Sequence, residues 1–377
     1  MTGRLFEALV GMVAEWFGHH PKEKRMSAYA GLDVSLNETS ICIVDSQGSL
    51  LLESRVASEP EAIAQSLNSH AENLRSVGIE ASALGGWLQR ELTALGFEAI
   101  VIEARHTHVS LSSMRNKTDR NDARGIAQLM RLGWYKVVHV KSPEAQRLRV
   151  LLGCRQLASR KLVDVENEIR GVLRAFGLKV GSVSRGRFAA RVLSLAEQAG
   201  ALIEEVVQRM LAIRGTLLIE YRRLHQLVVK ATVLDPVCRR LRTVPGIGPV
   251  AALAFRCGVD DPHRFKRSRT VAAHFGMTPR RHQSGEVDYT GRISKCGDRE
   301  VRQALYNAAG SLLRRSRKAS PLRTWGLRIR KRSGMKKATV AVSRKMAVIM
   351  HRMWLDGTDF RCSNDPAAAA LAPAASA

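Results

Sequence analysis

The stretch A-G-L-D-V-S-L-N-E-T-S-I-C-I-V-D-S-Q-G-S-L, from Ala30 to Leu50, decides the fold of the first part of the chain. Two runs rich in β-branched and apolar residues flank a polar turn, and D-S-Q-G marks a second turn before L-L-E-S-R-V. This pattern predicts a meander of three strands. Asp33 stands in the middle of the first apolar run, where a carboxylate is costly unless it is partnered or bound to metal.

Strands and helices alternate after this meander. We expect a helix from Glu59 to about Arg75, a short strand at V-G-I-E-A (77–81), a helix closed by Gly96, and a strand at F-E-A-I-V-I-E. A further helix is expected from Thr118 to Leu132, with Thr118 as its N-cap. Such alternation is typical of a mixed α/β layer with parallel pairings.

The next part of the chain lacks strand signals. Apolar residues at a 3,4 spacing run from Leu162 to Phe176 and again from Ile203 to Leu217, and a Gly- and Ser-containing segment (177–186) separates the two runs. This spacing predicts two long helices that form an α-hairpin or coiled-coil arm, with ordinary bundle helices as the alternative.

Helical patterns continue beyond the arm. V-P-G-I-G-P (244–249) is a Gly-rich turn leading into a helix, and further helical stretches follow at 268–275, 297–316 and 335–354. The expected segments are therefore an N-terminal extension (1–27), an α/β domain (28–143), a helical arm (144–235), a helical C-terminal domain (236–360) and a disordered, low-complexity tail (361–377).

The net charge of the chain limits the kinds of molecule that it is expected to bind. Sixty Lys and Arg against 34 Asp and Glu give a formal net charge of +26 and an isoelectric point near 10.7, and such a field attracts polyanions, usually nucleic acid. No stretch reaches about 18 uninterrupted apolar residues, so we expect no membrane span. The six cysteines have no metal-site or disulfide-framework spacing, which predicts a reduced cytoplasmic location.

Four carboxylates form an ordered set along the α/β domain. R-N-K-T-D-R-N-D-A (115–123) puts Asp119 and Asp122 on one face of the expected helix. Asp33 lies on the first strand, and Glu80 ends V-G-I-E-A. Hard divalent cations such as Mg²⁺ take oxygen ligands, and convergent carboxylates hold them in phosphodiester chemistry. This set predicts a metal site.

Other acidic residues compete with this interpretation. Glu103, after the fifth expected strand, is the rival of Glu80, and Asp45 is most simply a turn former. Taken alone, the Asp pair on the helix is also compatible with solvated helix decoration.

A second polar block, G-R-I-S-K-C-G-D, occupies residues 291–298. Ser294 lies between Arg292 and Lys295, shortly before a helix expected to begin at about Asp298. A serine hydroxyl is a poor nucleophile until a base or a cationic field activates it, and the same surroundings hold a phosphate. From these residues alone, a phosphate contact or a helix cap is the simpler interpretation.

Residues 314–345 form the densest positive run of the chain. On a protein that binds nucleic acid, such a run favours contact with the phosphate backbone; a solvated stretch is the alternative. Trp325, inside this run, can stack on a base, but we favour a role as a core anchor for its helix.

The first strand Asp, a strand Glu and R-N-K-T-D-R-N-D-A resemble the four-carboxylate RNase H-like, RuvC-like domain of the insertion-sequence 110 family of transposases. The family's first motif is matched by G-L-D-V-S with Asp33, and its I-E-A motif picks Glu80, although I-E-A recurs at 102–104. The distinctive R-N-K-T-D-x-x-D-A signature is intact and supplies Asp119 and Asp122.

The C-terminal part is similar to the same family. G-M-T-P-R-R-H-Q-S-G and R-I-S-K-C-G-D-R-E-V-R-Q-A-L-Y match two family blocks, with Met277 in place of the usual Leu. The nucleophilic serine of the family maps to Ser294, and Ser284 is a decoy in an expected loop before it. V-P-G-I-G-P also matches the family and resembles a helix-hairpin-helix, which offers backbone N–H groups to phosphates.

The resemblance covers about residues 28–360 and implies a DNA transposase or recombinase. It implies that the four carboxylates bind Mg²⁺, or Mn²⁺ in its place, and that Ser294 attacks the scissile phosphate to form a phosphoserine intermediate. It further implies a structured guide RNA, a homo-oligomer (dimer or tetramer) whose carboxylates and serine meet across protomers, and a bacterial, nucleoid-associated location. The expected nucleic-acid contacts are Arg115, Lys117, Arg120, Arg292, Lys295 and Arg299.

Two other functions stay open from the residues. In a metal-only junction resolvase or nuclease, water attacks and Ser294 merely grips phosphate. In a non-catalytic nucleic-acid-binding protein, the carboxylates have no chemical role.

Overall fold

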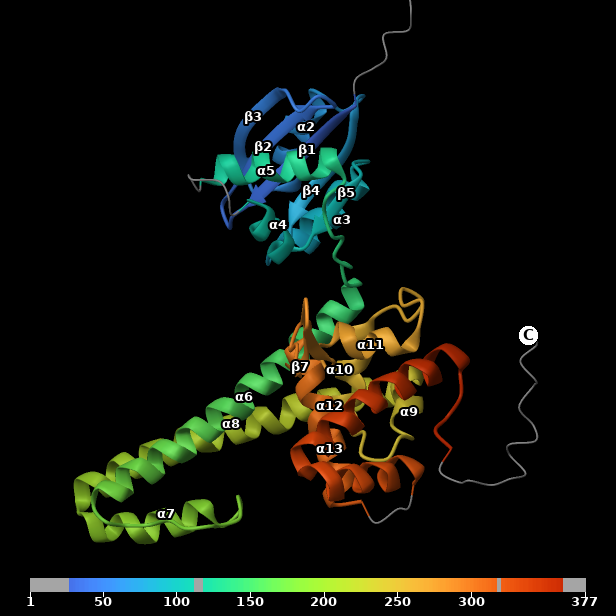
Figure 1. Ribbon diagram of the computed structural model, residues 1–377. Coiled ribbons are helices and arrows are strands. Elements are labelled where there is room, and N and C mark those ends of the chain that lie inside the picture. Colours follow the sequence, from blue (N-terminus) through green and yellow to red (C-terminus); the bar gives the residue numbers. More distant parts are fainter. Residues whose placement is uncertain (1–26, 112–117, 317–319, 362–377) are drawn as a thin grey trace, which may run out of the picture. The chain divides into compact units, whose positions relative to one another are not determined.

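The computed structural model describes residues 27–111, 118–316 and 320–361, and the chain divides into two compact units, one up to Lys141 and the other from Ser142 onward (Figure 1). The first unit is mixed α/β and the second is mainly helical, as the sequence predicts. Apart from residues 27 and 361, the expected N-terminal extension and C-terminal tail lie outside the described ranges.

The first unit is built on a five-stranded sheet in the order β3-β2-β1-β4-β5. The first three strands form the predicted antiparallel meander, and the last two run parallel to β1. The strands are β1 (Ala28–Val34), β2 (Glu38–Asp45), β3 (Leu50–Ala57), β4 (Leu74–Glu80) and β5 (Ala99–Ile102).

Helices cover both faces of this sheet. α2 (Pro60–Asn68) and α3 (Gly85–Ala94) bury Ile63, Leu67, Leu88 and Leu92 against one face, together with strand residues such as Leu32. α5 (Asp119–Leu132) lies across the other face (Figure 1), and α4 (Ala104–Leu111) precedes it in the chain.

One predicted helix is shorter than expected. The sequence predicted helix from Glu59 to about Arg75, but α2 ends at Asn68 and β4 already begins at Leu74. The polar segment between them forms turns in which His70 and Asn73 make local backbone hydrogen bonds, so the chain reverses before Leu74. The apolar Leu74 therefore belongs to a strand.

The second unit begins with two long helices, α6 (Pro143–Ala175) and α8 (Ala201–Leu234), which pack side by side (Figure 1). The sequence predicted both helices but missed α7 (Phe188–Ala196) and the short 3₁₀ turn η1 (Glu197–Ala199) between them. Phe188 and Val192 of α7 are buried against residues of the two long helices, such as Ile169. This cluster explains why the connection is ordered.

The seam of α8 differs from the apolar spacing in the sequence. Val206 and Ile213 of the predicted series are 40% and 52% exposed, whereas Val207, Arg214 and Val228 are buried. The true inward positions repeat every seven residues, and one of them is an arginine. A reading of apolar residues alone could not find that register.

The remaining elements form a helical bundle with one hairpin. The helices are α9 (Pro236–Leu241), α10 (Pro249–Val259), α11 (Ser268–His274), α12 (Arg299–Arg314) and α13 (Pro321–Asp356), and the strands are β6 (Pro279–Ser284) and β7 (Val287–Ile293). Phe255 and Phe275 lie at the centre of the apolar core of this bundle. Trp325 is half-buried and packs against the same core, beneath the ammonium of Lys345, as expected for an anchor.

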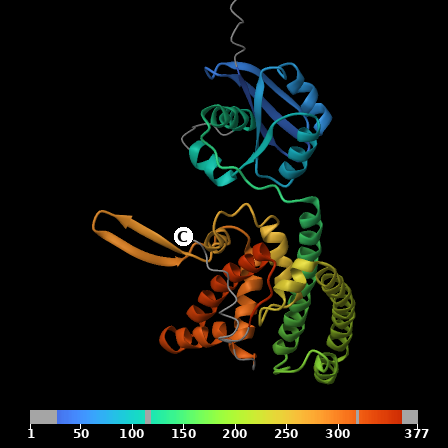
Figure 2. The same ribbon diagram turned by 90° about the vertical axis from the view of Figure 1, so that its right-hand side faces the viewer.

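The hairpin of β6 and β7 is absent from the sequence prediction. Its residues are mostly exposed on both faces, and Figure 2 shows it projecting from the helices. An isolated ribbon without a buried face lacks the alternation of apolar and polar residues that identifies a strand. Ser284 therefore ends a strand and does not lie in a loop.

Among the described residues, no helix has the length and apolar character needed to cross a membrane. The five cysteines in the described ranges are free thiols, and Cys42, Cys238 and Cys257 are buried. Cys154 and Cys296 are exposed.

Candidate active site

The position of α5 on the sheet is fixed by a glycine. A Cβ atom added at Gly31 of β1 would lie 2.3 Å from the carbonyl oxygen of Ala123 and 2.3 Å from the amide nitrogen of Ala127. A Cβ at Gly78, the register partner of Gly31 on β4, would lie 3.0 Å or less from side-chain atoms of Met130 and Ile126. The helix backbone therefore rests directly on β1, and its next row of side chains covers β4.

The direction of α5 follows from its two ends. Gln128 and Arg131, near its C-terminus, donate hydrogen bonds to the carbonyl oxygens of Gly48 and Ser46 at 2.9 and 3.4 Å. These acceptors lie in the β2–β3 turn, which is next to the beginning of β1 because Ala28 pairs with Asp45. The N-terminus of α5 therefore points toward the end of β1, where Asp33 lies.

This geometry brings the four predicted carboxylates to one edge and one face. Two residues along a strand advance about 6.6 Å, and four residues along a helix advance about 6.0 Å. Moving two residues forward along β1 from Gly31 therefore covers nearly the same distance as moving four residues back along α5 from Ala123. This correspondence aligns Asp119 with Asp33 along the sheet, and the same step from Gly78 and Ile126 aligns Asp122 with Glu80. Since side chains alternate along a strand, both strand carboxylates share the face that α5 covers.

The helix start is well formed locally. The Thr118 side chain accepts a hydrogen bond from the Asn121 N–H at 3.2 Å, which confirms it as the N-cap. Asp119 and Asp122 occupy the first turn, where acidic residues interact favourably with the helix dipole. Gly133, in the left-handed conformation, ends the helix.

Arginines neighbour this edge. Arg55 of β3 lies in register with Ser40 and hence with Asp33, and its guanidinium is 3.9 Å from the Asp119 carboxylate. Arg120, predicted to contact nucleic acid, is bound to the Glu53 carboxylate in the described conformation. Sequence reasoning missed Arg55 and Glu53, although their i,i+2 spacing in L-L-E-S-R-V indicates a shared face.

The carboxylates share an edge without converging. Within the described part of the chain, no three His, Cys, Asp or Glu side chains lie close enough together to hold a metal ion. Asp33, Glu80 and Asp122 are half-buried and Asp119 is exposed. Their oxygen chemistry fits a hard divalent cation, and their mutual repulsion opposes a closer approach unless a cation offsets it.

The rival acidic residues have other roles. Asp45 accepts hydrogen bonds from the N–H groups of Gln47 and Ser49, both at 2.8 Å, which confirms it as a turn former. Glu103 lies just beyond β5, and its carboxylate is 3.3 Å from the Lys136 ammonium. This ion pair gives Glu103 a structural role of its own.

Ser294 lies in the second unit, directly after β7. Its N–H donates to the carbonyl oxygen of Thr278 at 2.8 Å, and its own carbonyl oxygen accepts from Arg280 at 3.2 Å. Lys295, which follows, has a left-handed φ of 57° and is exposed. The serine is thus held by its backbone at the base of the hairpin, among cations. Ser284 is at the other end of β6.

The helix after Ser294 is anchored at its first turn. Asp298 caps α12 by accepting hydrogen bonds from the N–H groups of Glu300 and Val301, and it is paired with Arg149 of α6. Burial raises the pKa of Asp298, but the hydrogen bond and charge of Arg149 and the two N–H groups outweigh it, so the net pKa is lowered. The block that contains the serine is therefore tied to the long helix.

The other predicted cationic contacts are only partly visible. Arg292, Lys295 and Arg299 are exposed around the serine block. Arg115 and Lys117 lie outside the described residues.

Comparisons with known proteins agree with this division of the chain. Residues 30–177 match the DEDD-type transposase domain of IS110 elements, and residues 238–323 match the transposase domain of the IS116/IS110/IS902 family. The two matches together span more than half of the chain. The chain belongs to the IS110 family of transposases.

Relatives from bacteria support this membership. The chain is 29% identical over 341 residues to the "Transposase for insertion sequence element IS1111A" of Coxiella burnetii, which covers 88% of this chain and 91% of that protein. It is also 29% identical over 248 residues to the "Probable family 20 transposase" of Pseudomonas aeruginosa, covering 63% of this chain and 71% of that one. Family membership implies a protein that binds, cleaves and rejoins DNA, with a domain of a type that uses a divalent metal.

Proposed function

We propose that this transposase cuts and rejoins DNA with two groups, the carboxylate set Asp33, Glu80, Asp119 and Asp122 and the nucleophile Ser294. The observation that carries the proposal is the register of α5 on the sheet, which aligns the helix pair with the strand pair. The strand order β3-β2-β1-β4-β5, with β2 antiparallel to its neighbours, further supports an RNase H-like, RuvC-like domain.

The four carboxylates would hold Mg²⁺. When bound, the cation supplies charge that stabilises the negative oxygens of the reacting phosphate. The chain itself orients the carboxylates through the seat of α5 and the Thr118 cap. Arg55 beside Asp119 would draw a phosphate toward an edge that would otherwise repel it.

The proposed chemical step is an exchange of phosphate esters. The Ser294 oxygen bonds to the scissile phosphorus as the bond to the 3′ oxygen of the upstream nucleotide breaks. The serine proton is released, and the departing oxygen takes up a proton to become a 3′-hydroxyl. Attack of another 3′-hydroxyl on the phosphoserine reverses these changes and rejoins DNA without an external energy source. Arg292 and Lys295 would stabilise the phosphate during both steps.

The serine assignment is tested by comparing Ser294→Ala with Ser284→Ala. A DNA substrate labelled at its 3′ end should form a protein-linked product, stable to detergent, with the wild type and with Ser284→Ala but not with Ser294→Ala. Cleavage by Ser294→Ala at the wild-type rate, without any linked product, would favour attack by water and a metal-only nuclease.

The carboxylates and the serine belong to different compact units. We propose that they cooperate between protomers of a homo-oligomer, dimeric or tetrameric. Mixing Asp119→Asn protein with Ser294→Ala protein should then restore part of the cleavage that each lacks alone. Metal-dependent cleavage by Asp119→Asn alone at the wild-type rate would contradict the proposed metal role.

We also propose a structured guide RNA that pairs with target and donor DNA. The net charge of +26 and the long basic run support a nucleic-acid partner, and pairing would then read sequence while the protein holds the backbone. RNA recovered with the purified protein should map to non-coding DNA beside its gene and contain loops complementary to the element's junction and target. Full, sequence-specific recombination by RNA-free protein would contradict this proposal.

A further inference from the structure

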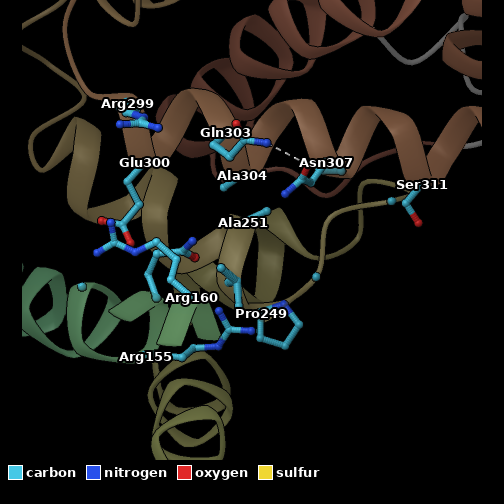
Figure 3. Close-up of a pocket in the computed structure, with 16 residues that line it drawn as sticks. Arg155, Arg160, Pro249, Ala251, Arg299, Glu300, Gln303, Ala304, Asn307 and Ser311 are labelled. Carbon is cyan, nitrogen blue, oxygen red and sulfur yellow. Dashed lines mark hydrogen bonds between the residues drawn. The ribbon is translucent and has the colours of Figure 1, made fainter. Parts of the chain in front are cut away.

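A pocket of about 670 Å³ lies within the second unit, between α6, the start of α10 and one face of α12 (Figure 3). This volume falls in the range of small-molecule sites, about 300–1,000 Å³. Small residues leave the space open: Gly153 on α6, Ala251 on α10, and Ala304 and Ala308 on α12. A Cβ added at Gly153 would meet no atom within 4 Å.

The α6 side of the pocket is cationic. Arg155 donates to the Tyr221 hydroxyl at 2.8 Å and to His225 Nδ1 at 3.2 Å, so neutral partners hold its guanidinium in place. Arg160, five residues further along α6, and Arg299, on α12, make no ion pair with any described residue. Fixed or uncompensated guanidinium groups at a cavity are suited to a phosphate group.

The backbone adds to this preference. Gly248 precedes α10 and offers no side chain to cap the N–H groups of the first turn, and both Gly248 and Ala251 line the pocket. Pro249 has no N–H and Ala252 donates to the Gly248 carbonyl oxygen at 3.0 Å, so the N–H groups of Val250 and Ala251 are the ones without an acceptor within the helix. Like the arginines, they can donate hydrogen bonds to a phosphate group.

The polar groups on the α12 side of the pocket are mainly side-chain amides. Gln303 donates a hydrogen bond to Asn307 Oδ1 at 3.1 Å, which leaves the Gln303 oxygen and the Asn307 amide protons available (Figure 3). Figure 3 shows Gln303 and Asn307 across the pocket from Arg155 and Arg160. An acceptor next to a donor is the arrangement that reads the edge of a nucleobase.

Glu300 is the acidic member of the pocket. Burial and then the charge of Asp298 raise its pKa, against Arg149 and Arg155, which lower it. It lies on α12, beside Gln303 and Ala304, where a carboxylate can accept a hydrogen bond from the exocyclic amine of a base.

We propose that this pocket binds one unstacked nucleotide of a single nucleic-acid strand, with its phosphate at Arg155, Arg160 and the start of α10 and its base at Gln303 and Asn307. The proposal rests on the proposed function in one respect, that the protein's ligand is nucleic acid. A concave site with two arginines of α6 on one side and the amides of Gln303 and Asn307 on the other matches the two ends of a nucleotide, whereas a duplex backbone needs only an open cationic surface.

The first variant fills the pocket without removing any of its cations. Gly153→Phe places a ring in the open space, and Gly171→Phe, on the same helix, is the matched control because a Cβ there also meets no atom within 4 Å. Both variants are made in a Ser294→Ala background, so that binding is measured without cleavage. Arg160→Gln is the second variant, and thermal unfolding confirms that each protein is folded.

Binding of a fluorescein-labelled single-stranded oligonucleotide is measured by anisotropy at several salt concentrations. Gly153→Phe should weaken binding by about tenfold or more, as expected for loss of a base contact. Gly171→Phe should bind like the parent, and Arg160→Gln should reduce the salt slope by about one. Equal binding by Gly153→Phe and the parent, with Arg160→Gln also unchanged, would overturn the proposal.

Two further arms distinguish the sources of the nucleotide. A duplex of the same sequence should lose less affinity than the single strand in Gly153→Phe, and an equal loss would overturn the assignment of an unstacked base. Free AMP that occupies the pocket of the parent without displacing the oligonucleotide would point to a free nucleotide and would overturn a strand ligand. The linked-product assay with Ser294 intact is independent, so failure of the pocket and failure of the serine mechanism give different results.

Discussion

Gly31→Ala should damage the candidate active site from a distance. The new Cβ would lie 2.3 Å from two backbone atoms of α5, whereas ordinary van der Waals contact begins at 3.4 Å. Backbone atoms within a helix cannot rotate away, so α5 must withdraw from β1 by about 1 Å. Asp119 and Asp122 lie in the first turn of that helix and would move with it.

The neighbouring glycine provides the comparison. Gly78→Ala creates contacts of 2.5 and 2.7 Å, but with the Cγ and Sδ atoms of Met130, a flexible side chain that can adopt another rotamer. Overpacking typically costs about 1–3 kcal/mol. We therefore expect Gly31→Ala to lower the free energy of unfolding by about 3 kcal/mol and Gly78→Ala by about 1 kcal/mol.

Urea unfolding followed by circular dichroism measures these values, and metal-dependent cleavage of labelled DNA measures the functional effect. A displacement of about 1 Å at reacting groups can reduce a rate about a hundredfold, so folded Gly31→Ala protein should cleave far more slowly than Gly78→Ala. Equal stability and equal cleavage for the two variants would show that α5 does not rest on Gly31, and the proposed alignment of the carboxylates would fail.

Three further predictions concern the second unit. Arg214, with a side chain 6% exposed, lies 2.8 Å from the Glu166 carboxylate, so Arg214→Ala should destabilise the protein by about 3 kcal/mol; an unchanged urea midpoint would contradict a buried pair. Replacing both residues by leucine should recover most of that loss. Burial lowers the pKa of His351 below its ordinary 6.5, so the neutral imidazole stabilises the fold above that pH and this contribution is lost as the pH falls. The melting temperature should therefore drop between about pH 7 and 5, and His351→Gln should weaken this dependence of the melting temperature on pH. Asp298→Ala removes the cap of α12 and leaves Arg149 unpaired, so it should cost about 2 kcal/mol, and calorimetry showing no loss would exclude that role.

Much of the first unit was predictable because its signals are local. The meander follows from two turns in one short stretch, and the start of α5 follows from Thr118 and an acidic first turn. The predicted end of α2 was wrong because helix and strand propensities do not separate Leu74 from the helical run before it. The pairing of Leu74 with Ala28 places it in a strand.

The second unit was less predictable where polar residues are buried or apolar ones are exposed. Arg214 is buried because Glu166 and the carbonyl oxygen of Arg185 bind it, which no apolar pattern indicates. The hairpin of β6 and β7 has no buried face, so its strands carry no alternation. The pocket depends on Gly153, Ala304 and Ala308, small residues far apart in sequence that only packing brings together.

The sequence by itself identified the four candidate carboxylates, Asp33, Glu80, Asp119 and Asp122, by residue type, order and local motif. Only the tertiary structure decided how the helix pair is aligned with the strand pair, because that depends on close approach of α5 to Gly31 and on the direction in which the helix crosses the sheet. A motif specifies a side chain and its immediate backbone. The distance between two motifs depends on packing between elements, which no single stretch of sequence contains.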